Sequence, residues 1–68
     1  MAQVAKFIEV SSSSTKGFED AVSGGLKKVA GSVKNLKGAW VNEMKVICHP
    51  DGSVAEWRVN MRVSFVVE

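Results

Sequence analysis

The sequence predicts an α+β fold in which one amphipathic helix packs on a three-stranded antiparallel sheet, in the order β-α-β-β. Two patterns support this prediction. Apolar and polar residues alternate over the closing segment 54–67, whereas apolar residues recur at spacings of three and four over the segment 15–35. Alternation is typical of a strand with one buried face, and the wider spacing is typical of a helix. The 68 residues are expected to form a single domain, 1–68.

The closing strand, 54–67, is the element around which the rest of the chain is expected to be arranged. Its apolar row contains Trp57, Val59, Met61, Val63, Phe65 and Val67. At about 3.3 Å per residue this strand spans roughly 45 Å, whereas a helix of about twenty residues spans only about 30 Å. One small chain therefore cannot cover the whole apolar face, and the sequence favours association with other copies.

The first half of the chain predicts a strand followed by the helix. The strand is expected over 4–10, where β-branched and aromatic residues predominate, and the serines 11–14 are expected to end it. The helix is expected over 15–35, with Ser14 as its N-cap and Gly38 just past its C-terminal end. Its apolar stripe consists of Phe18, Ala21, Val22, Gly25, Leu26, Val29, Ala30 and Val33.

The second half predicts a hairpin of two strands, 39–48 and 54–67, joined by a turn at 49–52 that contains proline and glycine. The simplest register pairs Cys48 with Ser53. That register places two pairs of opposite charges across the hairpin, Glu43 with Arg58 and Lys45 with Glu56. It also puts Trp40, Met44 and Val46 on the face of Trp57, Val59 and Met61, although a β-bulge would move part of the strand to the other face.

Composition and charge exclude several classes of function. The formal net charge of the chain is only +2, and its lysines and arginines form no continuous run in the sequence. Both observations argue against nucleic-acid binding. No apolar stretch approaches the roughly eighteen residues of a membrane span, and the N-terminus has no signal-peptide pattern. The single cysteine, Cys48, cannot form an internal disulfide. We therefore expect a cytoplasmic protein with no nucleic-acid or membrane partner.

No set of residues predicts catalysis or metal binding. Cys48, His49 and Asp51 lie close together in the sequence, but neighbouring residues on a strand point to opposite faces. A zinc site would also need a second cysteine or histidine, and the chain has neither. We therefore expect no enzyme and no resident metal.

The two tryptophans are better candidates for a binding site than the group of Cys48, His49 and Asp51. Trp57 belongs to the apolar row and is expected in the core. Trp40 has small neighbours, Gly38 and Ala39, and three interpretations remain open for it. It can pack in the core, fill a subunit interface, or present a flat surface on which an aromatic ligand stacks.

Several motifs follow one another in a characteristic order. They are Lys-Phe-Ile-Glu-Val at 6–10, a Ser/Thr-rich turn, Phe-Glu-Asp-Ala-Val at 18–22, Val-Asn-Glu at 41–43, and the closing strand 57–68. In this order they resemble the dodecin family over almost the whole chain. The resemblance implies a β-α-β-β protomer in a hollow homododecamer, in which contacts between subunits cover the apolar face of the long strand.

The resemblance also implies a ligand site. Dodecins typically hold flavin in pairs between tryptophans near symmetry axes, with a glutamine on the last strand assisting. Aligned on 41–43, the position of the stacking tryptophan is Gly38, and Trp40 lies two residues later, about 7 Å along a strand. Aligned on 59–65, the position of the glutamine is Arg58. The candidate cofactor-binding residues are therefore Trp40, Arg58 and Gly38.

Two functions follow from these observations. The first is a dodecin-like, homododecameric protein that binds and stores a small ligand. The ligand is a flavin (FMN, FAD or riboflavin) stacked on Trp40, or another phosphate-bearing cofactor such as coenzyme A, because Arg58 and Arg62 suit a phosphate. The alternative is a structural shell without flavin or any other cofactor, in which Trp40 packs between subunits.

Overall fold

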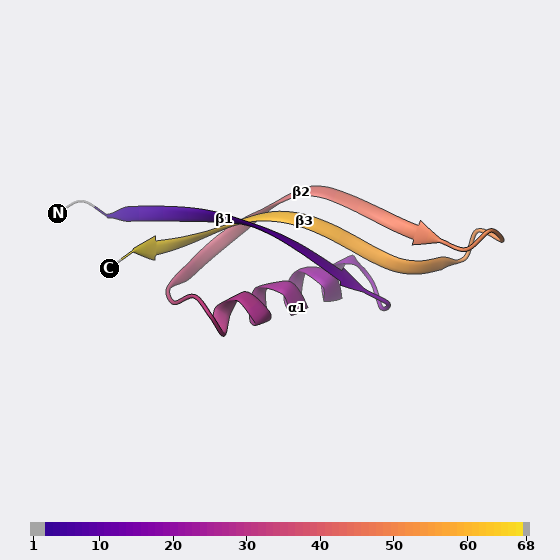
Figure 1. The fold of residues 1–68 in the computed structure, drawn as a ribbon, viewed down its shortest axis with the longest axis horizontal. Helices are drawn as coiled ribbons and strands as arrows, with labels where there is room; N and C mark the ends of the chain where they lie inside the picture. The colour runs from indigo at the N-terminus through magenta and orange to yellow at the C-terminus, as the bar shows by residue number, and fades with distance from the viewer. Residues whose placement is uncertain (1–2, 68) are drawn as a thin grey trace.

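The computed structural model describes residues 3–67 as one antiparallel sheet with a single helix on one face (Figure 1). The elements in chain order are β1 (Val4–Ser14), α1 (Phe18–Ala30), β2 (Leu36–Cys48) and β3 (Val54–Val67). The strand order is β1-β3-β2, so the closing strand lies in the centre of the sheet. The predicted β-α-β-β topology is confirmed. Below, the sheet side that carries α1 is called the helix face, and the opposite side is called the outer face.

The core lies between α1 and the apolar row of β3. Val59, Met61 and Val63 from that row are fully buried, and Ala21 of α1 is buried against them. The helix contributes a further set of half-buried side chains, Phe18, Val22, Leu26 and Val29. The strand alternation and the helical stripe therefore meet as predicted. Within residues 3–67, no helix is long and apolar enough to cross a membrane.

Gly25 marks the closest approach of α1 to the sheet. A Cβ atom at this position would lie 2.8 Å from the Cβ of Ser12 and 3.0 Å from the Cε of Met61. The Ser12 hydroxyl is itself fixed, because it donates a 2.7 Å hydrogen bond to the carbonyl of Ala21. Gly24 differs, since a Cβ atom there would meet nothing within 4 Å.

We expect Gly25→Ala and Gly24→Ala to change stability in opposite directions. The first overpacks the contact with Ser12 and should cost about 1–3 kcal/mol. The second should stabilise the protein by up to about 1 kcal/mol, because alanine is a better helix former than glycine. Thermal midpoints at equal protein concentration measure both changes. A midpoint that rises equally in both variants would show that no close approach restricts residue 25.

The boundaries of β1 and α1 differ from the prediction. The serines 11–14 continue β1 instead of ending it, because each one is paired with β3. The helix has 13 residues and begins at Phe18, with Gly17 as an N-cap that makes no side-chain hydrogen bond. Ser14 is therefore not the N-cap. Its hydroxyl donates to Asp20 Oδ2 at 2.6 Å and accepts from the Lys16 backbone N–H at 2.9 Å, which fixes the turn between β1 and α1.

The C-terminal end of α1 also comes earlier than predicted. The chain leaves the helix at Gly31, and Asn35 adopts a positive φ of 64° just before β2 starts. Val33 and Gly38 therefore lie outside the helix, with Gly38 already in β2. Asparagine tolerates this left-handed conformation better than most residues, so Asn35 is where the chain reverses into the sheet.

The predicted register of the hairpin is wrong by two residues over 43–47 and by one residue over 38–41. Lys45 lies opposite Arg58, and Glu43 lies opposite Asn60, so neither predicted pair of opposite charges forms across the strands. Arg58 instead pairs with Glu56 of its own strand at 3.0 Å. The difference arises because β2 contains register irregularities at 36–38, 41–43 and 47–48.

The bulge at 41–43 also places Trp40 on the other face from the one predicted. Trp40 pairs with Arg62, which points to the outer face, whereas Met44 and Val46 pair with Val59 and Trp57 and remain on the helix face as predicted. An extra residue in one strand reverses the direction of every side chain beyond it. Trp40 is therefore excluded from the core and is 57 % exposed.

The turn of the hairpin forms at the predicted residues. The Gly52 backbone N–H donates to the His49 carbonyl at 2.9 Å, and Gly52 has a positive φ of 90°. Asp51 Oδ1 accepts hydrogen bonds from the hydroxyl and the backbone N–H of Ser53. The Ser53 side chain, followed by its backbone, lowers the pKa of the Asp51 carboxyl. The carboxylate therefore supports the turn at neutral pH, and this support is lost as the pH falls through the lowered pKa.

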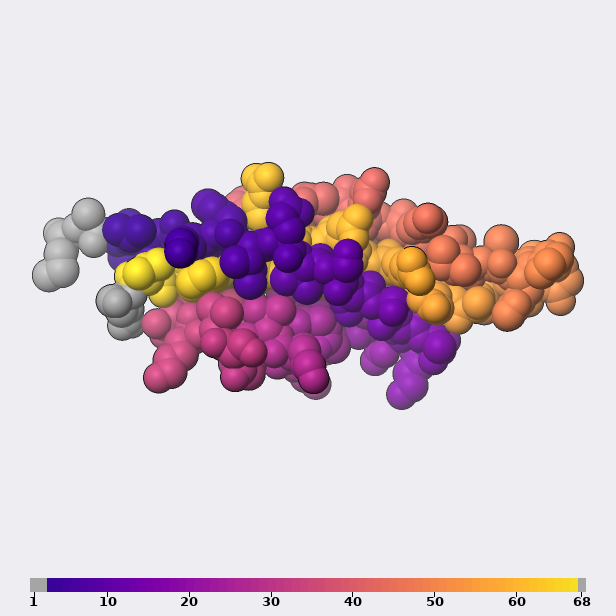
Figure 2. Space-filling view, viewed as in Figure 1, coloured from indigo at the N-terminus to yellow at the C-terminus, as the bar shows by residue number. Residues whose placement is uncertain are grey.

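The helix covers only part of the sheet. Thirteen helical residues span about 20 Å, whereas the molecule extends over 56 × 20 × 13 Å. Figure 1 and Figure 2 show the end of the β2–β3 hairpin, in orange, projecting past the helix. On the helix face of β2, Val41, Met44 and Val46 stay 42 %, 59 % and 42 % exposed. These three residues form the uncovered apolar row of the protomer.

Candidate functional site

All three residues singled out from the sequence lie on the outer face. This face carries no helix, and residues of all three strands lie on it. They are Phe7, Glu9, Ser11 and Ser13 of β1; Gly38, Trp40, Glu43 and Lys45 of β2; and Arg58, Asn60, Arg62 and Ser64 of β3. Aromatic, cationic and hydroxyl groups are thus displayed together on a rigid sheet, which is a suitable support for a binding site.

An exposed aromatic pair lies toward one end of the outer face. The ring centroids of Phe7 and Trp40 are 5.6 Å apart, with an interplanar angle of 44°. The two rings come from the two edge strands and meet across β3. Phe7 is 52 % exposed and Trp40 57 % exposed. So large an apolar surface outside the core is the usual mark of a contact with a ligand or another subunit.

Gly38 lies beside this pair and keeps space open. It occurs in β2 opposite Ser64, whose hydroxyl donates a 3.2 Å hydrogen bond to the Gly38 carbonyl. A Cβ atom at Gly38 would meet nothing within 4 Å. Arg62 on β3 lies between the edge strands and makes a 3.6 Å ion pair with Glu9. The aromatic pair is therefore bordered by open space at Gly38, by the polar Ser64 and by the cationic Arg62 of the central strand.

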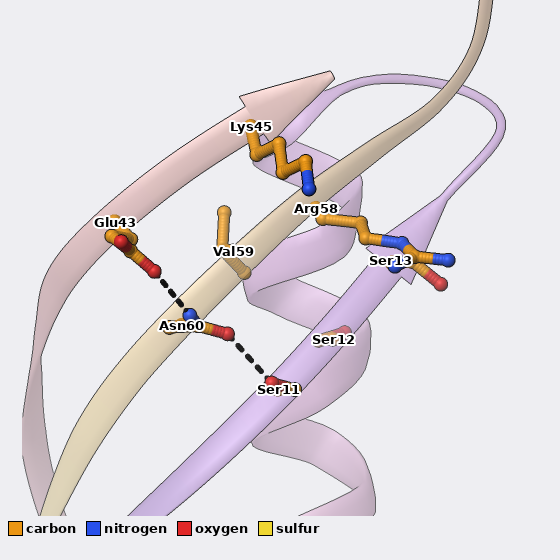
Figure 3. Close-up of a pocket in the computed structure, with 8 residues that line it drawn as sticks. All are labelled: Ser11, Ser12, Ser13, Glu43, Lys45, Arg58, Val59 and Asn60. Atoms are coloured by element: carbon orange, nitrogen blue, oxygen red, sulfur yellow. Dashed lines mark hydrogen bonds between the residues drawn. The ribbon is translucent and has the colours of Figure 1, made fainter. Parts of the chain in front are cut away.

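A shallow depression of about 360 Å³ lies further along the same face (Figure 3). It is bordered by Lys45, Arg58, Ser13 and a row of hydrogen-bonded polar side chains. We call it the cationic depression. Figure 3 shows Arg58 extending toward Ser13, with α1 on the far side of the sheet.

The row of polar side chains crosses all three strands. Asn60 Nδ2 donates to Glu43 Oε1 at 2.5 Å, and the Ser11 hydroxyl donates to Asn60 Oδ1 at 2.6 Å. Asn60 is therefore satisfied on both sides, and the Glu43 carboxylate is turned to Asn60 (Figure 3). This row forms one wall of the cationic depression.

The chain is similar to one family of known proteins over nearly its whole length. The dodecin model matches residues 4–68. The chain belongs to the dodecin family. Dodecins are small proteins that bind ligands, flavins among them, without catalysing a reaction. No curated protein sequence matches the chain significantly.

Solved dodecin structures superpose closely on the protomer. A crystallised arginine-to-alanine variant of Thermus thermophilus dodecin has a TM-score of 0.91 at 27 % identity, with 98 % of each chain covered. Dodecin from Streptomyces davaonensis has a TM-score of 0.93 at 24 % identity, covering all of this chain and 98 % of that one. The calcium dodecin of Mycobacterium tuberculosis, described with a calcium-binding site, has a TM-score of 0.81 at 25 % identity, covering 96 % and 91 %.

The dodecin fold brings together some of the sequence-predicted residues and separates others. Gly38 and Trp40 are neighbours on the outer face, whereas Arg58 lies four residues along β3 from the partner of Trp40 and belongs to the cationic depression. Sequence reasoning missed Phe7 because the alternation in the first strand is blurred. It missed the approach of Lys45 to Arg58 because the register was wrong. Over residues 3–67, no group of three acidic, histidine or cysteine side chains is arranged to hold a metal ion.

Proposed function

We propose that this dodecin assembles as a hollow homododecamer that binds and stores a flavin on the outer face of its sheet. The observation that carries the proposal is the exposed Phe7–Trp40 pair, with ring centroids 5.6 Å apart, on a face that no helix covers. Membership of a flavin-binding family supports the same ligand class. FMN, FAD and riboflavin share the tricyclic ring that would stack there.

The uncovered apolar row supports the assembly. Val41, Met44 and Val46 face the solvent on the helix side of β2, next to a groove bordered by Phe18, Leu26 and Met44. Burying apolar surface contributes about 25 cal/mol per Å², and a chain of 68 residues has a correspondingly small core of its own. A second copy that covers this row would add the missing part of the core.

The open space at Gly38 supports binding at a shifted position. In the family pattern a tryptophan stands at the position of Gly38, and here the indole comes from Trp40 on the same face of the same strand. Removing the side chain at one position while adding an indole two residues later moves the stacking surface along the strand. A planar ligand can then lie over Gly38 and contact the edge or face of Trp40.

The experiment that tests the proposal combines native mass spectrometry with a riboflavin titration. Native mass spectrometry of freshly purified protein should give twelve copies of the chain and any retained ligand. Added riboflavin should lose its fluorescence as its ring stacks on the indole. A stable monomer would refute the assembly, and a colourless protein that leaves the fluorescence unquenched would refute the flavin site.

A second candidate is an assembled shell without flavin. It is favoured by Gly38 in place of the stacking tryptophan and by Arg58 in place of the assisting glutamine. In that case Trp40 and Phe7 would pack against another subunit. The two candidates differ in what Trp40 contributes, which a substitution at this residue measures directly.

A further inference from the structure

The two methionines within residues 3–67 differ sharply in exposure. Met61 of β3 lies in the core and is 0 % exposed, whereas Met44 of β2 is 59 % exposed. A peroxide oxidises the thioether of a methionine to the sulfoxide where it can reach the sulfur. In the free protomer, Met44 is therefore the methionine of this part of the chain that a peroxide attacks first.

Met44 also lies where a polar group is poorly tolerated in an assembly. It stands between Val41 and Val46 in the uncovered apolar row on the helix face. It borders the groove that Phe18 and Leu26 of α1 line. In the proposed assembly another copy covers this row, and that copy then shields the Met44 sulfur from solvent.

Oxidation would replace the apolar thioether with a hydrogen-bond acceptor. The sulfur lone pair attacks one peroxide oxygen and the O–O bond breaks, so the sulfur gains one oxygen atom and the other leaves as water. The sulfur is oxidised by two electrons and the peroxide is reduced by two. The sulfoxide is polar, and its neighbours in the row, Val41 and Val46, carry no side-chain donor. Burying the sulfoxide without a donor is unfavourable.

We propose that oxidation of Met44 in the free protomer blocks assembly, so that the oligomer forms only from chains with the reduced thioether. This inference rests on the proposed homododecamer and describes its regulation. The control acts before assembly, because the assembled protein covers the sulfur and the unassembled chain leaves it open. It is reversible, since methionine sulfoxide reductases restore the thioether.

The test uses a Cys48→Ser, Met61→Leu background. These substitutions remove the exposed thiol and the core thioether, and leucine nearly conserves the volume of methionine. The background, and a matched variant that also carries Met44→Leu, are treated with hydrogen peroxide in guanidinium chloride and refolded by dilution. Both retain Met1, which therefore does not distinguish them.

Native mass spectrometry of the refolded samples measures the assembled fraction. Oxidation should raise the chain concentration needed for assembly of the background at least about tenfold. The Met44→Leu variant should assemble as well after peroxide as before it. Methionine sulfoxide reductase should restore the oligomer of the oxidised background.

The outcomes separate this inference from the proposed function. Equal assembly of the oxidised background and its Met44→Leu partner would refute the control while the homododecamer stands. Circular dichroism must show a folded protomer in the oxidised background, because loss of the fold itself would also refute the inference. A wild-type protein that does not assemble without any oxidant refutes the proposed assembly instead.

Met44→Gln in the otherwise unmodified chain gives an independent test without peroxide. Its amide has a polarity similar to that of the sulfoxide, so the folded variant should fail to form the large oligomer at the wild-type concentration. Full assembly of Met44→Gln would overturn the proposal, whatever the behaviour of the Cys48→Ser, Met61→Leu background.

Discussion

Met44→Asp is expected to convert the proposed homododecamer into smaller species. Met44 is 59 % exposed in the protomer and lies in the middle of the uncovered apolar row, so the substitution leaves the protomer's own core intact. In an assembly it would bury an unpaired carboxylate in each copy, at a cost of several kcal/mol per copy. Size-exclusion chromatography and native mass spectrometry should therefore show loss of the large oligomer.

Met44→Leu is the matched control for this substitution. It conserves apolar character and nearly conserves volume, so it should cost less than about 1.5 kcal/mol and retain the oligomer. Circular dichroism of both variants shows whether the sheet itself survives. An aspartate variant that still elutes at the full size would show that the apolar row is not an interface.

Trp40→Ala is expected to abolish most flavin binding and to leave the oligomer assembled. Stacking of a heteroaromatic ring on a protein side chain contributes about 1–3 kcal/mol, so riboflavin affinity should fall by a factor of about 5 to 150. Titration of riboflavin fluorescence measures the affinity, and native mass spectrometry of the same sample measures the assembly. Trp40→Phe keeps a smaller ring at the site and should recover part of the affinity.

The outcome at Trp40 separates the two candidate functions. Loss of a measured ligand with full assembly would exclude the shell without flavin. Loss of the oligomer in Trp40→Ala, with the protomer still folded, would instead make Trp40 a packing residue between subunits. Phe7→Ala provides a further comparison, because it removes the partner ring in β1 and leaves the indole in place.

The central strand and the helix could be predicted because their patterns are local. The row from Trp57 to Val67 alternates with period two, and its middle residues Val59, Met61 and Val63 are buried as predicted, whereas Val67 stays 45 % exposed. The stripe from Phe18 to Val29 repeats along one helical face and packs against these three residues. The end of the first strand could not be predicted in this way. Serines are typical of turns, but β3 pairs with the first strand as far as Ser14, and this pairing outweighs the local preference.

The role of Trp40, Arg58 and Gly38 in ligand binding stays a prediction, and the sequence did not predict how these residues are arranged. Trp40, Arg58 and Gly38 were identified from residue type and resemblance, and all lie on the outer face. Their neighbours depend on contacts between distant parts of the chain. Phe7 reaches Trp40 only because β1 and β2 flank the same strand. Lys45 meets Arg58 only because the hairpin is shifted from the simplest register.

The bulge at 41–43 allows one strand to serve two surfaces. Just before it, Gly38 and Trp40 lie on the outer face; just after it, Met44 and Val46, which are also even-numbered, lie on the helix face. Without the bulge, side chains would alternate along β2 without interruption, and the indole of Trp40 would lie on the helix face with Met44. One additional residue, Asn42, therefore places the proposed ligand contact and the proposed subunit contact on opposite faces of one thirteen-residue strand. A substitution at Trp40 on the outer face and one at Met44 on the helix face would therefore affect the two proposed contacts separately.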